Sequence, residues 1–295
     1  MRDQGTDRHA RPGLSANTLA YAAPMPAPLV LVSVGNTRTR LACVEDNTLQ
    51  PSIVLESDNA EAIAAAIAGL LENAPADSTA VLASVNAPAA NAIETALLAR
   101  DIRVLRFGRE LEIPIITALT DDSTVGQDRL LDAMGAFARS KQACVVIDAG
   151  TAVTVDFVDG EGVFQGGAIA PGLSMMLDAL HEKTAALPSV RLSPELLPAK
   201  GPDDPVAPPF GKHTSQAMVL GALAAVRGMV HHLIDAYAEY YEAYPRVIAT
   251  GGDAPMLFEN DPLVELVVPD LALVGMLEAV RTLESLEESD DDPGV

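Results

Sequence analysis

The sequence has no tryptophan, only two cysteines and few cationic residues. Its 295 residues include 41 aspartates and glutamates against 19 lysines and arginines, which gives a formal net charge of −22. Such a charge repels nucleic-acid backbone and anionic lipid at long range, so we predict small molecules or other proteins as partners. Cys43 and Cys144 lie in apolar runs without a Cys or His at metal-ligand spacing, which indicates buried thiols rather than a zinc site.

Long uninterrupted apolar runs are also missing. No segment reaches the roughly 20 apolar residues that span a bilayer, and residues 1–27 lack a continuous apolar stretch. We therefore expect a cytoplasmic protein with neither a signal peptide nor a membrane anchor. Residues 1–27 and the acidic residues 287–295 have compositions typical of disordered tails.

Strand-like and helix-like segments alternate, which predicts an α/β architecture in two similar halves, residues 28–142 and 143–286. For the first half we expect strands from 29 to a Gly35-Asn36 turn, from that turn to 44, at 80–85 and at 102–105. We expect helices from 57 or 58 to about 72, at 91–100 and at 127–140. For the second half we expect strands from 143 to a turn at 148–151, from that turn to 158, at 163–169 and at 247–250, helices at 171–184, 214–241 and 271–286, and a Pro-rich loop at 194–209.

One pattern occurs twice, at residues 31–37 and 145–151. Each copy is an apolar strand that runs into a small Gly-Thr turn, and such turns can present backbone N–H groups and a hydroxyl to a phosphate. Taken alone, either turn is an ordinary hairpin; the doubling favours two related halves that face one nucleotide. When Gly35 is aligned with Gly150, Ser33 occupies the place of Asp148.

A second candidate site opens the helix at 127–140. Gly126 to Arg129 would place an acid and a base at a helix N-terminus, where an anionic ligand is favoured. Asp128 could accept a proton from a hydroxyl that attacks the γ-phosphate of ATP, and Arg129 could hold a carboxylate. The alternative is a surface ion pair at a helix entry.

Two further positions could contact ligands. Asp148 could hold a cation, and Thr250-Gly251-Gly252 could let a nucleotide base approach the backbone.

Seven motifs in order resemble type III pantothenate kinase, a family within the superfamily of sugar kinases, actin and heat-shock chaperones. The resemblance covers nearly everything between Leu29 and about Leu286. The motifs are V-G-N-T at 34–37, S-V at 84–85, G-x-D-R at 126–129, D-x-G-T-A at 148–152, G-G-x-I-x-P-G at 166–172, T-A-x-L-P at 184–188 and T-G-G at 250–252.

The resemblance implies two ribonuclease-H-like halves with ATP in the cleft between them, and phosphorylation of pantothenate to 4'-phosphopantothenate, the first step towards coenzyme A. It also implies Mg²⁺, a monovalent cation such as K⁺ or NH₄⁺ at Asp148, and a homodimer. Asp128 would be the general base. The implied pantothenate-binding residues are Gly126, Gln127, Asp128, Arg129 and Thr214, the last near a dimer interface. The implied ATP-binding residues are Ser33, Val34, Gly35, Asn36, Thr37, Arg38, Thr39, Arg40 and Thr151.

Two positions depart from the family pattern. Ser33 stands where the family has an Asp that helps to position Mg²⁺ with ATP, and Leu119 stands where it usually has a Tyr against pantothenate. Ser33 keeps open a catalytically weakened or inactive homologue that acts as an accessory regulator. A dinucleotide-binding oxidoreductase is a further alternative, but Gly35-Asn36-Thr37 lacks its G-x-G-x-x-G spacing.

Overall fold

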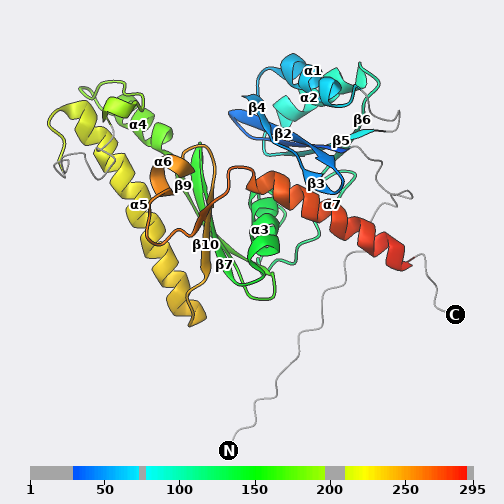
Figure 1. Ribbon diagram of the computed structural model, residues 1–295. Coiled ribbons are helices and arrows are strands. Elements are labelled where there is room, and N and C mark those ends of the chain that lie inside the picture. Colours follow the sequence, from blue (N-terminus) through cyan, green and yellow to red (C-terminus); the bar gives the residue numbers. More distant parts are fainter. Residues whose placement is uncertain (1–28, 73–77, 197–209, 291–295) are drawn as a thin grey trace, which may run out of the picture.

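The computed structural model describes residues 29–72, 78–196 and 210–290, which form two β-sheets with helices around and between them (Figure 1). The predicted tail at 1–27 and the loop from 197 to 209 lie outside these residues. The acidic tail was expected to begin at 287, but the last helix continues to Asp290.

The first sheet has the strand order β3-β2-β1-β5-β6, and β4 also pairs with β2. Its strands are β1 Leu29–Val34, β2 Arg38–Glu45, β3 Thr48–Leu49, β4 Ile53–Glu56, β5 Thr79–Ser84 and β6 Arg103–Arg106. The central strand β1 is antiparallel to β2 on one side and parallel to β5 on the other, and β6 continues the parallel direction.

The second sheet repeats this arrangement in the order β9-β8-β7-β10-β11. Its strands are β7 Cys144–Ala149, β8 Ala152–Val158, β9 Phe164–Pro171, β10 Arg246–Thr250 and β11 Leu266–Val267. The strand β7 is antiparallel to β8 and parallel to β10, which is parallel to β11. The two hairpins β1–β2 and β7–β8 are therefore equivalent, and the prediction of a duplicated α/β fold is confirmed.

Helices cover both faces of each sheet. They are α1 Ala60–Leu70, α2 Ala87–Leu98, α3 Gln127–Ser140, α4 Leu173–Glu182, α5 Thr214–Tyr241, α6 Ala254–Phe258 and α7 Leu271–Asp290, with a short 3₁₀ turn at Pro194–Leu196. The outer face of the first sheet packs against α1 and α2, and that of the second against α4, α5 and α6. The inner faces pack against α7 and α3, respectively (Figure 1).

Helices α3 and α7 pack closely on each other between the two sheets. A Cβ at Gly275 of α7 would lie 1.8 Å from the Leu131 carbonyl oxygen of α3, and one at Gly135 would lie 2.6 Å from the Leu271 carbonyl oxygen. Only glycine permits this approach at either position. Helix α7 thus comes from the end of the chain yet packs on the first sheet, and the N-terminus of α3 lies between the sheets.

Helix starts follow local capping more closely than the sequence patterns indicated. The Asn59 side chain accepts a hydrogen bond from Ala62 N (3.1 Å), so α1 begins at Ala60 rather than at 57. Asn86 accepts one from Ala89 N (3.2 Å) and Pro88 lies in the first turn, so α2 begins four residues before the predicted start at 91.

Helix α5 is long and apolar enough, by length and composition, to cross a membrane. One side of it is buried in the second core, where Val219, Val226 and Ile234 pack against the second sheet and its helices. This packing is that of a core helix.

Candidate active site

The two equivalent hairpin turns face each other. Thr37 Oγ1 and Thr151 Oγ1 are 3.1 Å apart, although 114 positions separate them in sequence. In the first turn Gly35 N donates to the Arg38 carbonyl (3.1 Å), and Ser57 Oγ donates to the Gly35 carbonyl (2.9 Å). The two copies of the motif therefore lie together between the halves, an arrangement in which both turns could bind the same phosphate chain.

Arginines on β2 reach from the first hairpin towards the second half. Arg40 Nη1 lies 3.1 Å from Asp270 Oδ1. The positive charge of Arg40 also lowers the pKa of Asp148, and that of Arg38 lowers the pKa of Asp253, against the upward effect of burial in both cases. Two cations thus stand beside the paired turns, where phosphate groups would be attracted.

Gly126 and Gln127 fix the start of α3. A Cβ at the N-cap Gly126 would lie 2.4 Å from Asp128 Oδ1, so a side chain there would displace the Asp128 carboxylate. Gln127 Nε2 donates to the Phe107 carbonyl (2.8 Å), and its Oε1 accepts from Ser84 N (3.0 Å). The amide of Gln127 therefore joins α3 to the first sheet, and pantothenate binding through this side chain remains a prediction.

Asp128 is the half-buried acid at this helix start. Its Oδ1 accepts a hydrogen bond from Arg129 N (2.8 Å). Burial raises the pKa of the carboxyl, and the hydrogen bond and the charge of Arg129 offset this only in part. A carboxyl with a raised pKa is a stronger proton acceptor once ionised, which suits a general base.

Arg129 forms a charge pair with Asp156 that the sequence reasoning missed. Its Nε lies 3.0 Å from Asp156 Oδ2, its Nη2 bonds Oδ1, and its guanidinium lies 5.5 Å from the centre of the Phe164 ring. Asp156 is 1% exposed on β8, where Thr154 is the only other polar residue, and a charge in such a strand was the signal that the sequence offered. The Arg129 side chain is held by Asp156, and its contact with substrate remains a prediction.

Two further acids lie beside Asp128. Burial and the charges of Asp128 and Asp156 raise the pKa of Asp148 to about 7. Asp132, one turn along α3 from Asp128, is 4% exposed, and within the described residues its Oδ1 has no hydrogen-bond partner. Sequence reasoning missed Asp132, although its spacing of four from Asp128 places both on one helix face.

Three further residues singled out from the sequence, Ser33, Leu119 and Thr214, lie on other elements around these acids. Ser33 is half-buried on β1 directly opposite Arg40 of β2, on the face that points to the inner layer. Leu119 packs against β9, where a Cβ at Gly166 would lie 3.0 Å from its Cδ2. Thr214 is exposed at the start of α5, and among the described residues no hydrogen bond joins it to α3.

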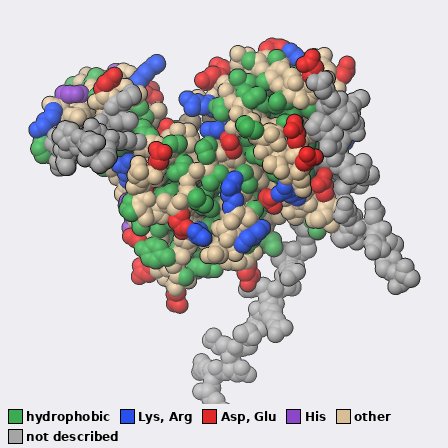
Figure 2. All heavy atoms as spheres, viewed as in Figure 1, with side chains coloured by type: hydrophobic (Ala, Val, Ile, Leu, Met, Phe, Trp, Pro, Cys, Tyr) green, Lys and Arg blue, Asp and Glu red, His purple; other side chains and the backbone are tan. Residues whose placement is uncertain are grey.

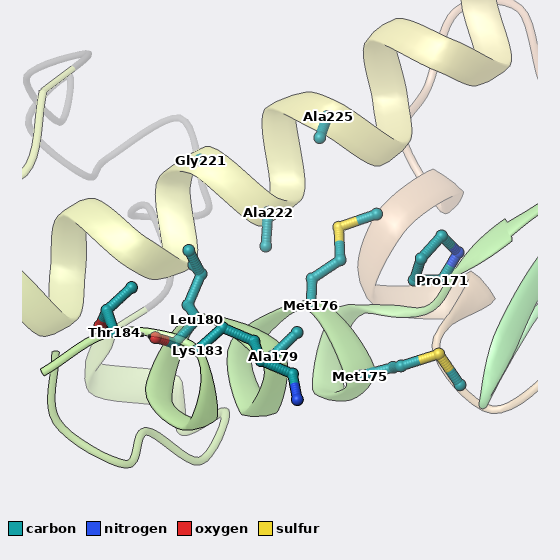
Figure 3. A pocket seen from close by; sticks show the side chains of 10 residues that line it. All are labelled: Pro171, Met175, Met176, Ala179, Leu180, Lys183, Thr184, Gly221, Ala222 and Ala225. Atoms are coloured by element: carbon teal, nitrogen blue, oxygen red, sulfur yellow. Dashed lines mark hydrogen bonds between the residues drawn. The ribbon is translucent and has the colours of Figure 1, made fainter.

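A separate apolar groove of about 640 Å³ runs between α4 and α5 (Figure 3). Met175 and Leu180 line it and remain exposed to solvent, and the α5 wall consists of small residues. The space-filling view shows apolar side chains scattered over the second half as well (Figure 2). The residues that line the groove are Pro171, Met175, Met176, Ala179, Leu180, Lys183, Thr184, Gly221, Ala222 and Ala225.

A sequence model described as type III pantothenate kinase matches residues 29–236. A relative of that name from Gluconobacter oxydans is 35% identical over 60% of this chain and 61% of its own length, so the match spans less than two thirds of that relative. Another, from Syntrophotalea carbinolica, is 30% identical over 84% of this chain and 96% of its own length.

A solved structure with a similar fold is that of a conserved putative Baf family transcriptional activator from Campylobacter jejuni. It aligns with a TM-score of 0.51 at 18% identity and covers 87% of this chain and 99% of that one. At that identity the likeness concerns the fold alone. The family model covers well over half of the residues, and most of the ordered motifs fall within it. The chain therefore belongs to the type III pantothenate kinase family.

Proposed function

We propose that the protein phosphorylates pantothenate with ATP to give 4'-phosphopantothenate and ADP. The observation that carries this proposal is the meeting of the two Gly-Thr turns, at the Thr37–Thr151 contact, beside the helix start that bears Asp128. The names of the relatives supply the substrate. Phosphoryl transfer needs mainly positioning and charge neutralisation, and this arrangement provides both.

ATP would lie with its phosphates between the turns. Residues 33–40 and Thr151 would contact it, and Arg38 and Arg40 would offset its charge. Mg²⁺ would arrive bound to ATP, as part of that substrate. The pantothenate hydroxyl would lie at Gly126–Arg129 and lose its proton to Asp128. Its oxygen would bond to the γ-phosphorus as the bond to the β–γ bridging oxygen breaks, and ADP would leave.

A monovalent cation, K⁺ or NH₄⁺, is proposed to bind at Asp148. The residues present fit such an ion, because buried carboxylates outnumber cations here and Asp132 Oδ1 has no partner among the described residues. No group of three or more His, Cys, Asp or Glu in that part of the chain is placed to hold a metal, so backbone oxygens and water would complete the shell. When bound, the ion supplies positive charge beside the phosphates.

We also propose a homodimer that buries the α4–α5 groove against a second copy. The groove is apolar and open in a single chain. One of its walls is α5, the helix that also carries Thr214, and the family resemblance associates Thr214 with a dimer interface. Light scattering of the purified protein tests this, and a mass of one chain would contradict it.

Both described cysteines are free and buried, in keeping with a cytoplasmic location.

The test of the activity is pantothenate-dependent ADP formation, compared between the wild type and Asp128→Asn. The asparagine keeps the acceptor oxygen for Arg129 N but cannot take a proton, so we expect kcat to fall by about 10²- to 10⁴-fold. Because the pKa of Asp128 is raised, wild-type kcat should fall as pH drops through a value above 3.8. Asp122→Asn, an exposed acid-to-amide change nearby, should retain activity.

A wild-type protein without pantothenate-dependent turnover, still silent as Ser33→Asp, would overturn this proposal. That result would favour the second candidate, an inactive homologue with a regulatory role. The observation behind this alternative is Ser33, because a hydroxyl brings no negative charge to Mg²⁺.

A further inference from the structure

Asp132 is a buried carboxyl that the reaction proposed above does not use. It is 4% exposed, and its Oδ1 has no hydrogen-bond partner among the described residues. Leaving a charged oxygen buried and unpaired is costly, so such a group normally holds a proton, a water molecule or a cation.

The packing of α3 on β7 places Asp132 level with Asp148. At the other end of this contact, α3 ends at Ser140 and β7 begins at Cys144, with only three residues between them. Asp148 is four strand residues further, about 13 Å along β7. The same length on α3, which runs the opposite way, is about nine residues and leads back from Ser140 to the turn that contains Asp132.

Charge in this region is unbalanced. The charge of Asp148 is the largest charge effect on Asp132, ahead of Asp128 and Asp156, and together with burial these acids raise its pKa well above the ordinary value. Of the two arginines nearby, Arg129 pairs with Asp156 and Arg40 with Asp270. Neither is among the charges that act on Asp132.

We propose that Asp132 is the second carboxylate ligand of a monovalent-cation site whose first carboxylate is Asp148. This inference rests on the proposed role of Asp148. The two carboxylates come from different elements, α3 and β7, so the ion would join the helix that bears Asp128 to the turn that bears Thr151. Asp132 would act on the reaction only through the ion.

The experiment measures thermal unfolding of the full chain without nucleotide, in KCl, NaCl, MgCl₂ or choline chloride at equal ionic strength. We expect K⁺ to raise the wild-type Tm by roughly 5 °C at saturation. Asp132→Asn should need at least about tenfold more K⁺ for the same rise. In choline chloride it should melt close to the wild type, because the raised pKa of Asp132 lets the wild-type carboxyl hold a proton when no ion is bound. Asp58→Asn, an exposed acid before α1, is the control and should respond like the wild type.

Each of the other possible results contradicts a specific part of the proposal. Asp132→Asn could show the same K⁺-dependent rise in Tm as the wild type, while Asp148→Asn shows none. Asp132 would then hold only a proton, and Asp148 alone would be the carboxylate ligand. No K⁺ response in the wild type would overturn both ligands, and a response to MgCl₂ alone would overturn the monovalent assignment. An intact K⁺ response in a protein without pantothenate-dependent turnover would contradict the proposed activity and leave this site in place.

Discussion

The hairpin turn after β1 and the turn after β7 occupy equivalent places in their sheets but carry opposite charge. Ser33 lies one residue before the end of β1 and pairs across the hairpin with Arg40. Asp148 lies one residue before the end of β7 and pairs with Thr154. Facing side chains of an antiparallel pair lie close together, so the first hairpin has a Ser–Arg pair where the second has an Asp–Thr pair.

Under the proposed function both turns contact ATP, but the charges beside them suit different ligands. A turn flanked by Arg38 and Arg40 suits the phosphates of ATP, whereas a turn with Asp148, Asp132 and Asp156 nearby suits a cation. The two hairpins therefore share one backbone arrangement and differ in charge at single positions, such as Asp148 in place of Ser33 and Arg40 in place of Thr154. Exchanging these residues is the direct way to test that division.

The largest effect is expected when the second turn is made like the first. Asp148→Ser removes the acid from the only turn that has one, so K⁺ stimulation of turnover should disappear and kcat/KM should fall by about 100-fold or more. Steady-state kinetics in KCl and in choline chloride would measure this. Asp58→Ser makes the same chemical change on the surface, and an equal loss there would show that net charge alone was responsible.

Much of this site could be predicted from sequence because it depends on local pattern. A strand followed by a Gly-Thr turn is a short-range signal, and its repetition predicted two related halves that face one nucleotide. The structure brings Thr37 and Thr151 together across 114 positions. The start of α3 at Gln127 was also readable from the chain. The strands β3 and β11 could not be predicted, because each has only two residues and two residues show no periodicity.

The acids around Asp128 were harder to predict because their roles come from tertiary packing. Asp156 stands out in sequence only as a charge within an apolar strand, and its partner Arg129 reaches it because α3 lies against the second sheet. Asp132 became notable only once its burial was known. The packing of α7 on the first sheet likewise depends on contacts between opposite ends of the chain, such as Arg40 with Asp270, and no local pattern predicts these.

A smaller effect is expected when the first turn is made like the second. Ser33→Asp places a carboxylate opposite Arg40, where the arginine offsets part of its charge. A carboxylate also binds Mg²⁺ better than a hydroxyl, so the Mg²⁺ concentration for half-maximal activity should fall by about tenfold. Titration of activity with MgCl₂ at fixed ATP measures this. Ser33→Asn, which adds similar bulk without charge, should show no such fall, and an equal response in both variants would contradict a role for the charge.

The smallest effect is expected where the two turns are alike, at the paired threonines. Thr37→Val and Thr151→Val each remove one neutral hydroxyl from opposite sides of the 3.1 Å contact while keeping the shape of the side chain. Loss of one such hydrogen bond is worth about 1 kcal/mol, which corresponds to a rise of roughly fivefold in KM for ATP with little change in kcat. If both hydroxyls contact the same phosphate chain, the double variant should show less than the product of the two single effects, because each hydroxyl also supports the other. Independent effects that simply multiply would mean that the turns bind ATP separately, and the symmetry of the two hairpins would then have no counterpart in how they hold the nucleotide.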